Sequence, residues 1–147
     1  LKNTGKYFNT LNISNSNSFQ PYRFTNYVVG NANFSGNALT GVPKYINVTT
    51  VEAMFKKRYS ISIIYNYTAS IPLTDANDAF AMDYRLLQAK INYHFAIQKS
   101  QLNVFISADN LLNETYSLGN DINAAGKRYY NPAPRRNFLT GISVRLL

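Results

Sequence analysis

The sequence LNVFISADNLLNETYSLGNDINAAGKRYYNPAPRRNFLTGISVRLL, residues Leu102–Leu147, decides the fold class. Apolar and polar residues alternate over 102–109 and again from Phe138 to the end of the sequence. A period of two predicts β-strands, each with one apolar and one polar face. The loop between them is rich in Gly, Asn and Pro and carries Arg-Tyr-Tyr at 128–130. Two such strands around a long polar loop suggest the last strands of a membrane β-barrel.

The preceding stretch, Tyr84–Phe95, alternates in the same way and predicts the partner of the first of these strands. We expect an antiparallel pair across a short polar turn at 96–101, because this register brings all apolar positions to one face. The expected partners are Phe95 with Leu102, Tyr93 with Val104, Ile91 with Ile106, and Ala89 with Ala108.

A second hairpin is predicted from Tyr45–Phe55 and Tyr59–Tyr67. A two-residue turn would place Glu52 opposite Ile61, so we expect a three-residue turn at Lys56–Arg58. That register pairs Ala53 with Ile61, Val51 with Ile63, and Thr49 with Tyr65.

The N-terminal stretch Gly5–Phe24 predicts one more strand, interrupted near Pro21 because proline lacks the ladder N–H. Its expected faces carry Tyr7, Asn9, Leu11 and Ile13 on one side, and Phe8, Thr10, Asn12 and Ser14 on the other.

Loop lengths alternate along the chain. The connections at 56–58 and 96–100 are short, whereas those at 30–43, 70–83 and 112–134 are long. Short turns at one end and long loops at the other are typical of outer-membrane barrels. We therefore predict an all-β fold, an antiparallel up-and-down meander of about six long strands. The smallest closed membrane barrels have about eight strands, and an open edge does not occur in lipid. The chain is then a fragment of a larger barrel or associates to close one, and a start at Leu1 without Met or a signal segment favours a fragment.

The composition limits the class of protein. The 147 residues fit one domain. No apolar run approaches the ~18 residues of a membrane helix, whereas a spanning β-strand needs only about 9–11, half of them polar. The 12 Tyr and 9 Phe suit a membrane interface, although a paratope-like surface or a stacking platform also uses tyrosine.

The charge indicates either a solvated basic surface or an anionic partner, since 15 basic residues stand against 7 acidic ones. The basic residues are scattered over loops and strand ends, which argues against nucleic acid. The absence of cysteine and the single histidine, His94, make a zinc site improbable. No catalytic constellation is present, so we expect no enzyme, no cofactor and no metal site.

Several short motifs, read in order, resemble the C-terminal part of TonB-dependent outer-membrane receptors. The segment 35–44, SGNALTGVPK, is similar to a recurrent turn of that family. The more specific motifs lie downstream, at Asn110-Leu111, Tyr116, Gly126, Arg128-Tyr129-Tyr130, Pro132-Ala133-Pro134 and Arg136-Asn137-Phe138. The resemblance implies that residues 1–147 are the last six or so strands of a barrel of about 22 strands, without its plug domain.

The resemblance also implies a function. The chain would be part of a multi-pass receptor of the Gram-negative outer membrane that imports a scarce nutrient such as a ferric siderophore. Its partners would be outer-membrane lipid and lipopolysaccharide, the remaining strands and plug, a small-molecule substrate and, through the missing N-terminal part, the TonB complex. Gly141, Val144 and Leu146 fit the spacing of the family's terminal assembly signal, but Leu147 adds a residue, and the aromatic residue that usually ends such barrels is missing.

Candidate site residues follow from the same patterns. Arginine donors suit an anionic chelate or a lipopolysaccharide phosphate, but the same loop residues can instead order the loop and flank the membrane edge. These candidates are Lys127, Arg128, Tyr129, Tyr130, Arg135 and Arg136. On the polar face, Lys90 lies diagonal to Asp109, within reach of a salt bridge, while His94 and Arg145 are expected as ordinary polar residues of that face. Asp75, Asp78 and Asp83 lack metal-site spacing and predict a solvated loop.

The apolar face is predicted to face lipid. Its members are Tyr59, Ile61, Ile63, Tyr65, Leu87, Ile91, Tyr93, Phe95, Leu102, Val104, Ile106, Phe138, Ile142, Val144 and Leu146. The alternative is a soluble antiparallel barrel or sandwich that binds a hydrophobic or anionic ligand, in which a second sheet would bury this face.

Overall fold

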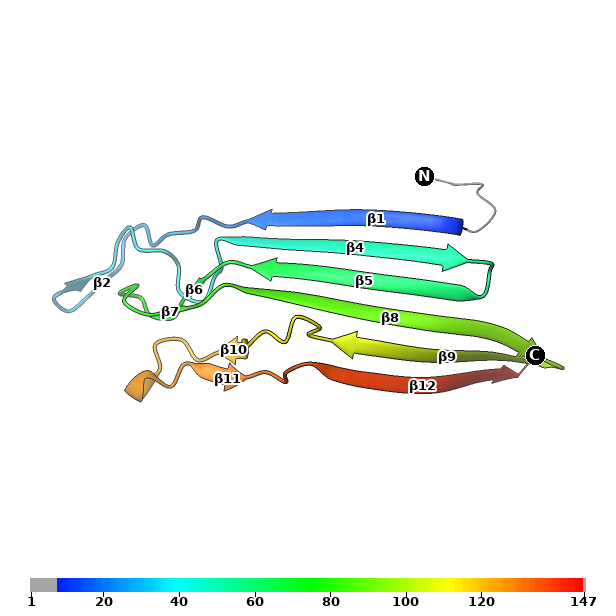
Figure 1. The fold of residues 1–147 in the computed structure, drawn as a ribbon. Coiled ribbons are helices and arrows are strands. Elements are labelled where there is room, and N and C mark those ends of the chain that lie inside the picture. The colour runs from blue at the N-terminus through cyan, green and yellow to red at the C-terminus, as the bar shows by residue number, and fades with distance from the viewer. Residues whose placement is uncertain (1–7, 147) are drawn as a thin grey trace.

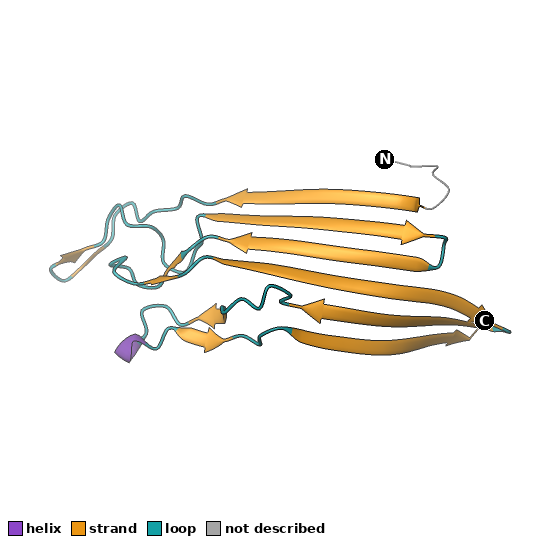
Figure 2. Ribbon diagram, viewed as in Figure 1, coloured by secondary structure: helices purple, strands orange, loops and turns teal. Residues whose placement is uncertain are grey.

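The computed structural model describes residues 8–146, and six long strands form one antiparallel sheet in it. Each long strand pairs with the next one along the chain, so the predicted meander is confirmed (Figures 1 and 2). The strands are β1 (Phe8–Phe19), β4 (Tyr45–Phe55), β5 (Tyr59–Thr68), β8 (Tyr84–Ile97), β9 (Ser100–Asp109) and β12 (Asn137–Leu146).

Both predicted hairpin registers are confirmed. β4 pairs with β5 so that Ala53 lies opposite Ile61, and β8 pairs with β9 so that Ile91 lies opposite Ile106. The β8–β9 strands continue further than expected, to the pair Ile97–Ser100, which leaves a tighter turn. Because side chains alternate along a strand, this register places every member of the predicted lipid-facing set on one face, called here the apolar face.

The first strand is shorter than predicted. β1 ends at Phe19, and beyond Pro21 only an isolated bridge between Arg23 and Ala38 remains. The ladder stops because proline offers no N–H. At the other end, a register shift lies between Phe8 and Thr10, so the predicted simple alternation does not hold there. Tyr7 lies outside the described residues.

All long loops lie at one end of the sheet, and the short turns lie at the other (Figure 1). Each long loop contains a small two-stranded hairpin. These hairpins are β2 (Val28–Val29) with β3 (Ala32–Asn33), β6 (Ile71–Pro72) with β7 (Phe80–Ala81), and β10 (Ser117–Asn120) with β11 (Tyr130–Pro132), the last enclosing the 3₁₀ turn η1 (Ala125–Lys127).

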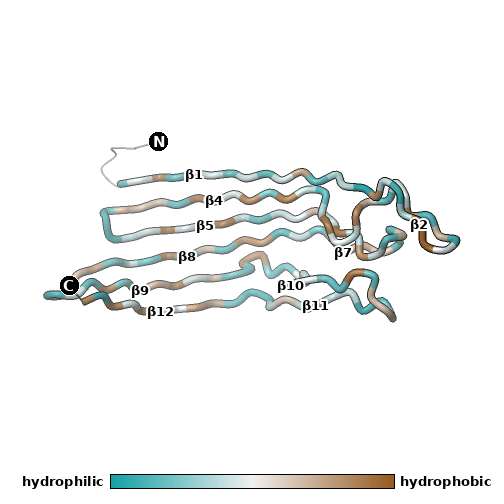
Figure 3. The backbone as a smooth tube through the Cα atoms, turned by 180° about the vertical axis from the view of Figure 1, so that it is seen from behind, coloured by the Kyte–Doolittle hydropathy of each residue, from teal (hydrophilic) through white to brown (hydrophobic). Residues whose placement is uncertain are grey.

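The sheet is a single layer whose apolar face is uncovered in the described part of the chain. Figure 3 shows apolar and polar residues alternating along the strands, with no second layer over them. Ile91 is 46% exposed, Ile106 53% and Ile142 68%. The small buried core, Leu73, Ala81 and Tyr129, lies in the loops. A soluble sandwich would bury these isoleucines within the chain, and the structure does not.

On the polar face, Phe105 of β9 lies across Gly141 of β12, its pairing partner. A Cβ atom at Gly141 would lie 2.6 Å from the ring of Phe105. The ring also carries the ammonium of Lys90 at 4.3 Å from its centroid. Glycine at 141 thus leaves room for an aromatic ring that connects β8, β9 and β12.

We expect Gly141→Val to lower the free energy of unfolding by about 1–3 kcal/mol, because the new side chain displaces the Phe105 ring. Denaturant titration of the folded protein in detergent measures this loss. Adding Phe105→Ala removes the clash and restores part of the stability. A double variant as unstable as the sum of both single variants would contradict this account.

Candidate functional site

The three long loops form one cluster at their end of the sheet. Loop A (20–44), loop B (69–83) and loop C (110–136) come from different parts of the sequence, and loop B contacts both of the others. The amide of Gly41 in loop A donates to the carbonyl of Pro72, and the amide of Asn123 in loop C donates to the carbonyl of Leu73, each at 2.8 Å. Loop B therefore connects loop A to loop C.

Asp75 in loop B is the centre of this connection. Its carboxylate accepts hydrogen bonds from Thr40 at 2.5 Å, Tyr27 at 3.1 Å and Asn123 at 3.0 Å. The Asn123 carboxamide oxygen in turn accepts from the Asp75 amide at 3.0 Å, and Asn37 donates to the Asp75 carbonyl at 2.7 Å. One aspartate thus joins residues of all three loops.

The prediction of a solvated acidic loop fits Asp78, which is exposed and bonded to Thr74 of its own loop, but is wrong for half-buried Asp75. Asp83 forms an ion pair with Arg85 at 3.1 Å. In the described part of the chain, no group of His, Cys, Asp or Glu side chains could hold a metal ion.

Asp75 and Tyr27 shift each other's titration in opposite directions. The hydrogen bond from Thr40 holds the pKa of Asp75 below its usual value, burial opposes this shift, and hydrogen bonds from Asn123 and Tyr27 add to it. The hydrogen bond to Asp75, followed by its negative charge, raises the pKa of Tyr27. Both shifts favour a carboxylate bonded to a neutral phenol, the state that joins the loops at neutral pH.

The side chains of two asparagines order the loops by donating hydrogen bonds to backbone carbonyls and accepting them from backbone amides. The Asn77 carboxamide donates to the Ala38 carbonyl at 3.0 Å and accepts from the Ala38 amide at 2.7 Å, which ties loop B to loop A. Asn110 is 3% exposed; it accepts from the Glu114 amide at 2.8 Å and donates to the Pro134 carbonyl at 3.3 Å. Asn110 therefore holds both ends of loop C together.

The six predicted basic and aromatic residues do not form a single site. Tyr129 is 8% exposed and packs in the loop core with Leu73 and Ala81, so the interpretation that it orders the loop fits this residue. Lys127 and Arg128 are exposed in the connection between β10 and β11, at the end of the 3₁₀ turn η1. Tyr130 is exposed at the start of β11, and Arg135 and Arg136 are exposed between the hairpin and β12.

Tyr130 instead contributes to a pocket of about 300 Å³ between loops B and C, which we call the aromatic pocket. Tyr84 and Tyr116 line it with ring centroids 5.1 Å apart. Met82, which is 83% exposed, lies at its margin. Alternation along β8 places Tyr84 on the polar face. The pocket can hold a flat or apolar group on the polar side of the sheet.

One predicted contact on the polar face is wrong. Lys90 forms no ion pair with Asp109, since Arg85–Asp83 is the only ion pair among residues 8–146. Lys90 has Phe105 and Asp109 as its two diagonal neighbours across β9, and its ammonium lies over the Phe105 ring. A cation–π contact thus takes the place of the salt bridge.

We expect Asp75→Asn to loosen loops B and C. The Asp75 carboxylate accepts three side-chain hydrogen bonds, and the carboxamide that replaces it carries no negative charge. Amide hydrogen exchange at Asp75 and Asn123 should accelerate by about tenfold. Asp78→Asn is the matched control, since Asp78 is an exposed aspartate of the same loop. Equal acceleration in both variants would refute the central role of Asp75.

The stabilising effect of Asp75 should also depend on pH. A lowered pKa in the folded state contributes stability above the ordinary value of 3.8, and this contribution is lost as pH falls through the folded-state pKa. The difference in melting temperature between wild type and Asp75→Asn should therefore shrink between neutral pH and strongly acidic pH. Circular dichroism at several pH values measures it, and a constant difference would contradict the assignment.

Comparison with solved structures finds a similar fold. No family model matches the sequence. The crystal structure of the siderophore receptor PiuA from Acinetobacter baumannii superposes with a TM-score of 0.72 at 17% sequence identity. The match covers 92% of this chain and 20% of PiuA, so the chain spans about one fifth of the length of that receptor. The chain is therefore similar in fold to a segment of a siderophore receptor.

Proposed function

We propose that the chain forms the C-terminal part of the barrel wall and outer loops of a TonB-dependent outer-membrane receptor that imports a scarce nutrient such as a ferric siderophore. The observation that carries this proposal is a sheet of six long strands whose apolar face, carried by β5, β8, β9 and β12, has no covering layer among the described residues. The sequence motifs of loops A and C and the fold similarity to PiuA support it.

The uncovered face has the layout of a membrane-spanning surface. On β5, Tyr59 and Tyr65 flank Ile61 and Ile63, and the strand has 10 residues, the length that a tilted spanning strand needs. Near the short turns, the ring of Tyr93 stacks on Tyr59 at 4.8 Å. Apolar residues between two aromatic girdles match the depth profile of a bilayer.

The girdle near the long loops also carries cations. The Tyr45 and Tyr67 rings lie 6.1 Å apart, and Arg85 lies over Tyr67 at 5.1 Å. Lys44 lies over Phe19 at 5.7 Å. Tyrosine hydroxyls and cations at this level suit the phosphates of outer-leaflet lipopolysaccharide.

The polar face would line the barrel interior, and the loop cluster would lie at the cell surface. The aromatic pocket opens on the polar side, where a ligand would enter. Of the candidate contact residues, the exposed cations Lys127, Arg128, Arg135 and Arg136 are available to an anionic ligand. Strands β1 and β12 each have one edge without a partner in the described sheet, and strands of a longer polypeptide would close the barrel there. The TonB complex would act through parts outside this chain.

We expect Ile63→Arg to lower the yield of folded protein in the outer membrane, because a cation on the lipid side costs about 2–4 kcal/mol near the bilayer centre. Ser62→Arg is the matched control, since it adds the same charge at the next residue, on the polar face. Heat-modifiable migration of membrane fractions measures the folded amount. Equal loss in both variants, or a greater loss for Ser62→Arg, would refute the lipid-facing assignment.

The transport role predicts that cells without the protein lose uptake of at least one ferric chelate under iron limitation. Tyr84→Ala combined with Tyr130→Ala should raise the half-saturating ligand concentration by about 30-fold, because each ring contributes about 1 kcal/mol of contact. Uptake of radiolabelled iron from a panel of siderophores measures both effects. Unchanged uptake of the whole panel in deletion cells would sink the siderophore assignment.

A further inference from the structure

The end of the sheet that carries the short turns is strongly cationic. Lys56, Lys57 and Arg58 connect β4 to β5, and Lys99 lies between β8 and β9. All four residues are exposed, and none of them forms an ion pair within residues 8–146. No Asp or Glu occurs in the stretches that build this end, which are 8–12, 53–61, 91–106 and 140–146. The positive charge of the turns is therefore uncompensated, and it attracts anions.

A row of stacked aromatic rings lies next to these turns on the apolar face. The rings of Tyr59 and Tyr93 stack with their centroids 4.8 Å apart, and those of Tyr93 and Phe95 stack at 5.2 Å. These three rings, which we call the ring platform, cross from β5 to β8. Phe95 pairs with Leu102 of β9, so an aliphatic side chain extends the platform. Such a surface suits the part of an acyl chain that lies just below a lipid headgroup.

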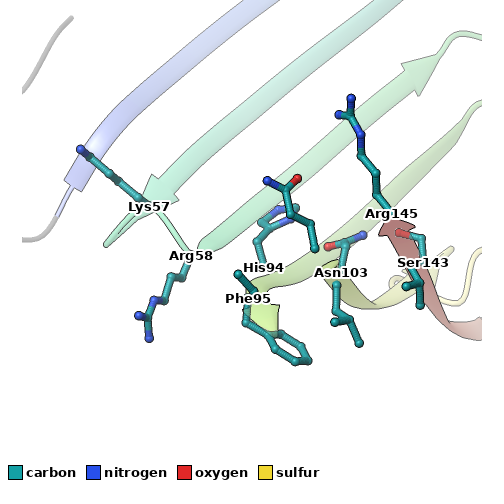
Figure 4. A pocket seen from close by; sticks show the side chains of 11 residues that line it. Lys57, Arg58, His94, Phe95, Asn103, Ser143 and Arg145 are labelled. Carbon is teal, nitrogen blue, oxygen red and sulfur yellow. The ribbon is translucent and has the colours of Figure 1, made fainter. Parts of the chain in front are cut away.

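The side chain of Arg58 lies on the same side of the sheet as the ring platform. Figure 4, a close view of the short-turn end, shows Arg58 and Phe95 extending to one side and Lys57 to the other. The amide of His94 donates to the carbonyl of Arg58 at 2.7 Å, which holds the turn against β8 one residue away from Phe95. An arginine at the end of a lipid-facing surface covers apolar atoms with its stem and keeps its charge in the headgroup layer.

We propose that Arg58 and the ring platform bind an anionic glycerophospholipid, of which phosphatidylglycerol is a simple example, in the leaflet at the short-turn end. The guanidinium donates two parallel hydrogen bonds to the lipid phosphate, and an acyl chain lies along the three rings. Lys56 and Lys99, in the two turns, attract a headgroup with net negative charge more strongly than a zwitterionic one. The inference rests on the proposed function, because it requires the apolar face to contact lipid.

Photo-crosslinking tests the inference on the full-length protein that contains this sequence, reconstituted in phosphatidylcholine bilayers. A phosphatidylglycerol probe with a diazirine in its acyl chain should label the peptide that contains Tyr93 and Phe95. The same amount of a phosphatidylcholine probe should label this peptide about tenfold less, and high salt should reduce the difference. Arg58→Gln should lower the labelling by phosphatidylglycerol about fivefold. Lys57→Gln is the matched control, since it removes the same charge from the same turn, on the opposite side of the sheet, and should change the labelling far less.

Arg58→Gln should fold as the wild type does, because the Arg58 side chain forms no hydrogen bond or ion pair among the described residues. Heat-modifiable migration checks this. Equal labelling by the two probes, or an equal loss in Arg58→Gln and Lys57→Gln, overturns the inference and leaves the proposed function intact. If neither probe labels any peptide of the apolar face, that face does not contact lipid, and both the inference and the proposed function are refuted.

Discussion

The antiparallel register of the six long strands is the constraint on which the rest of the structure depends. A shift of one residue in any pair would carry every side chain of that strand to the opposite face. With the observed register, Ile61, Ile91 and Ile106 lie in one row across three strands. The same register sends Lys90 and Arg145 to the other face. The single sheet thus separates an apolar surface from a cationic, polar one without a core of its own.

Order in the loops has a different physical origin. In the described part of the chain, only Leu73, Ala81 and Tyr129 form a buried apolar core, which is small for loops of this length. Hydrogen bonds to the side chains of Asp75, Asn77, Asn110 and Asn123 supply much of the remaining cohesion. Such bonds are directional, so the loops hold a defined shape with little buried surface.

The sequence predicted the sheet far better than the loops. Alternation and turn length together determined both hairpin registers, because both signals are local and repeat along each strand. Asp75 accepts hydrogen bonds from Thr40 and Asn123, which are 35 and 48 residues away in the sequence, and no periodic pattern predicts such contacts. For the same reason the motif at 128–130 resembles one cluster in the sequence, although folding buries Tyr129 and leaves Arg128 exposed between β10 and β11. The register alone does not predict the contact of Lys90 with Phe105, because Phe105 and Asp109 are both diagonal neighbours of Lys90 and either could be its partner.

The β2–β3 hairpin of loop A takes no part in the hydrogen bonds to these four side chains. In the described part of the chain, its two strands pair only with each other, and Val28 and Val29 are more than half exposed. Tyr27 and Asn37, which connect loop A to Asp75, lie outside the hairpin on either side. The tip at Gly30–Asn31 is therefore a place where a foreign peptide can be grafted while the loop cluster stays intact. An epitope displayed there would report on which side of a membrane the long loops lie.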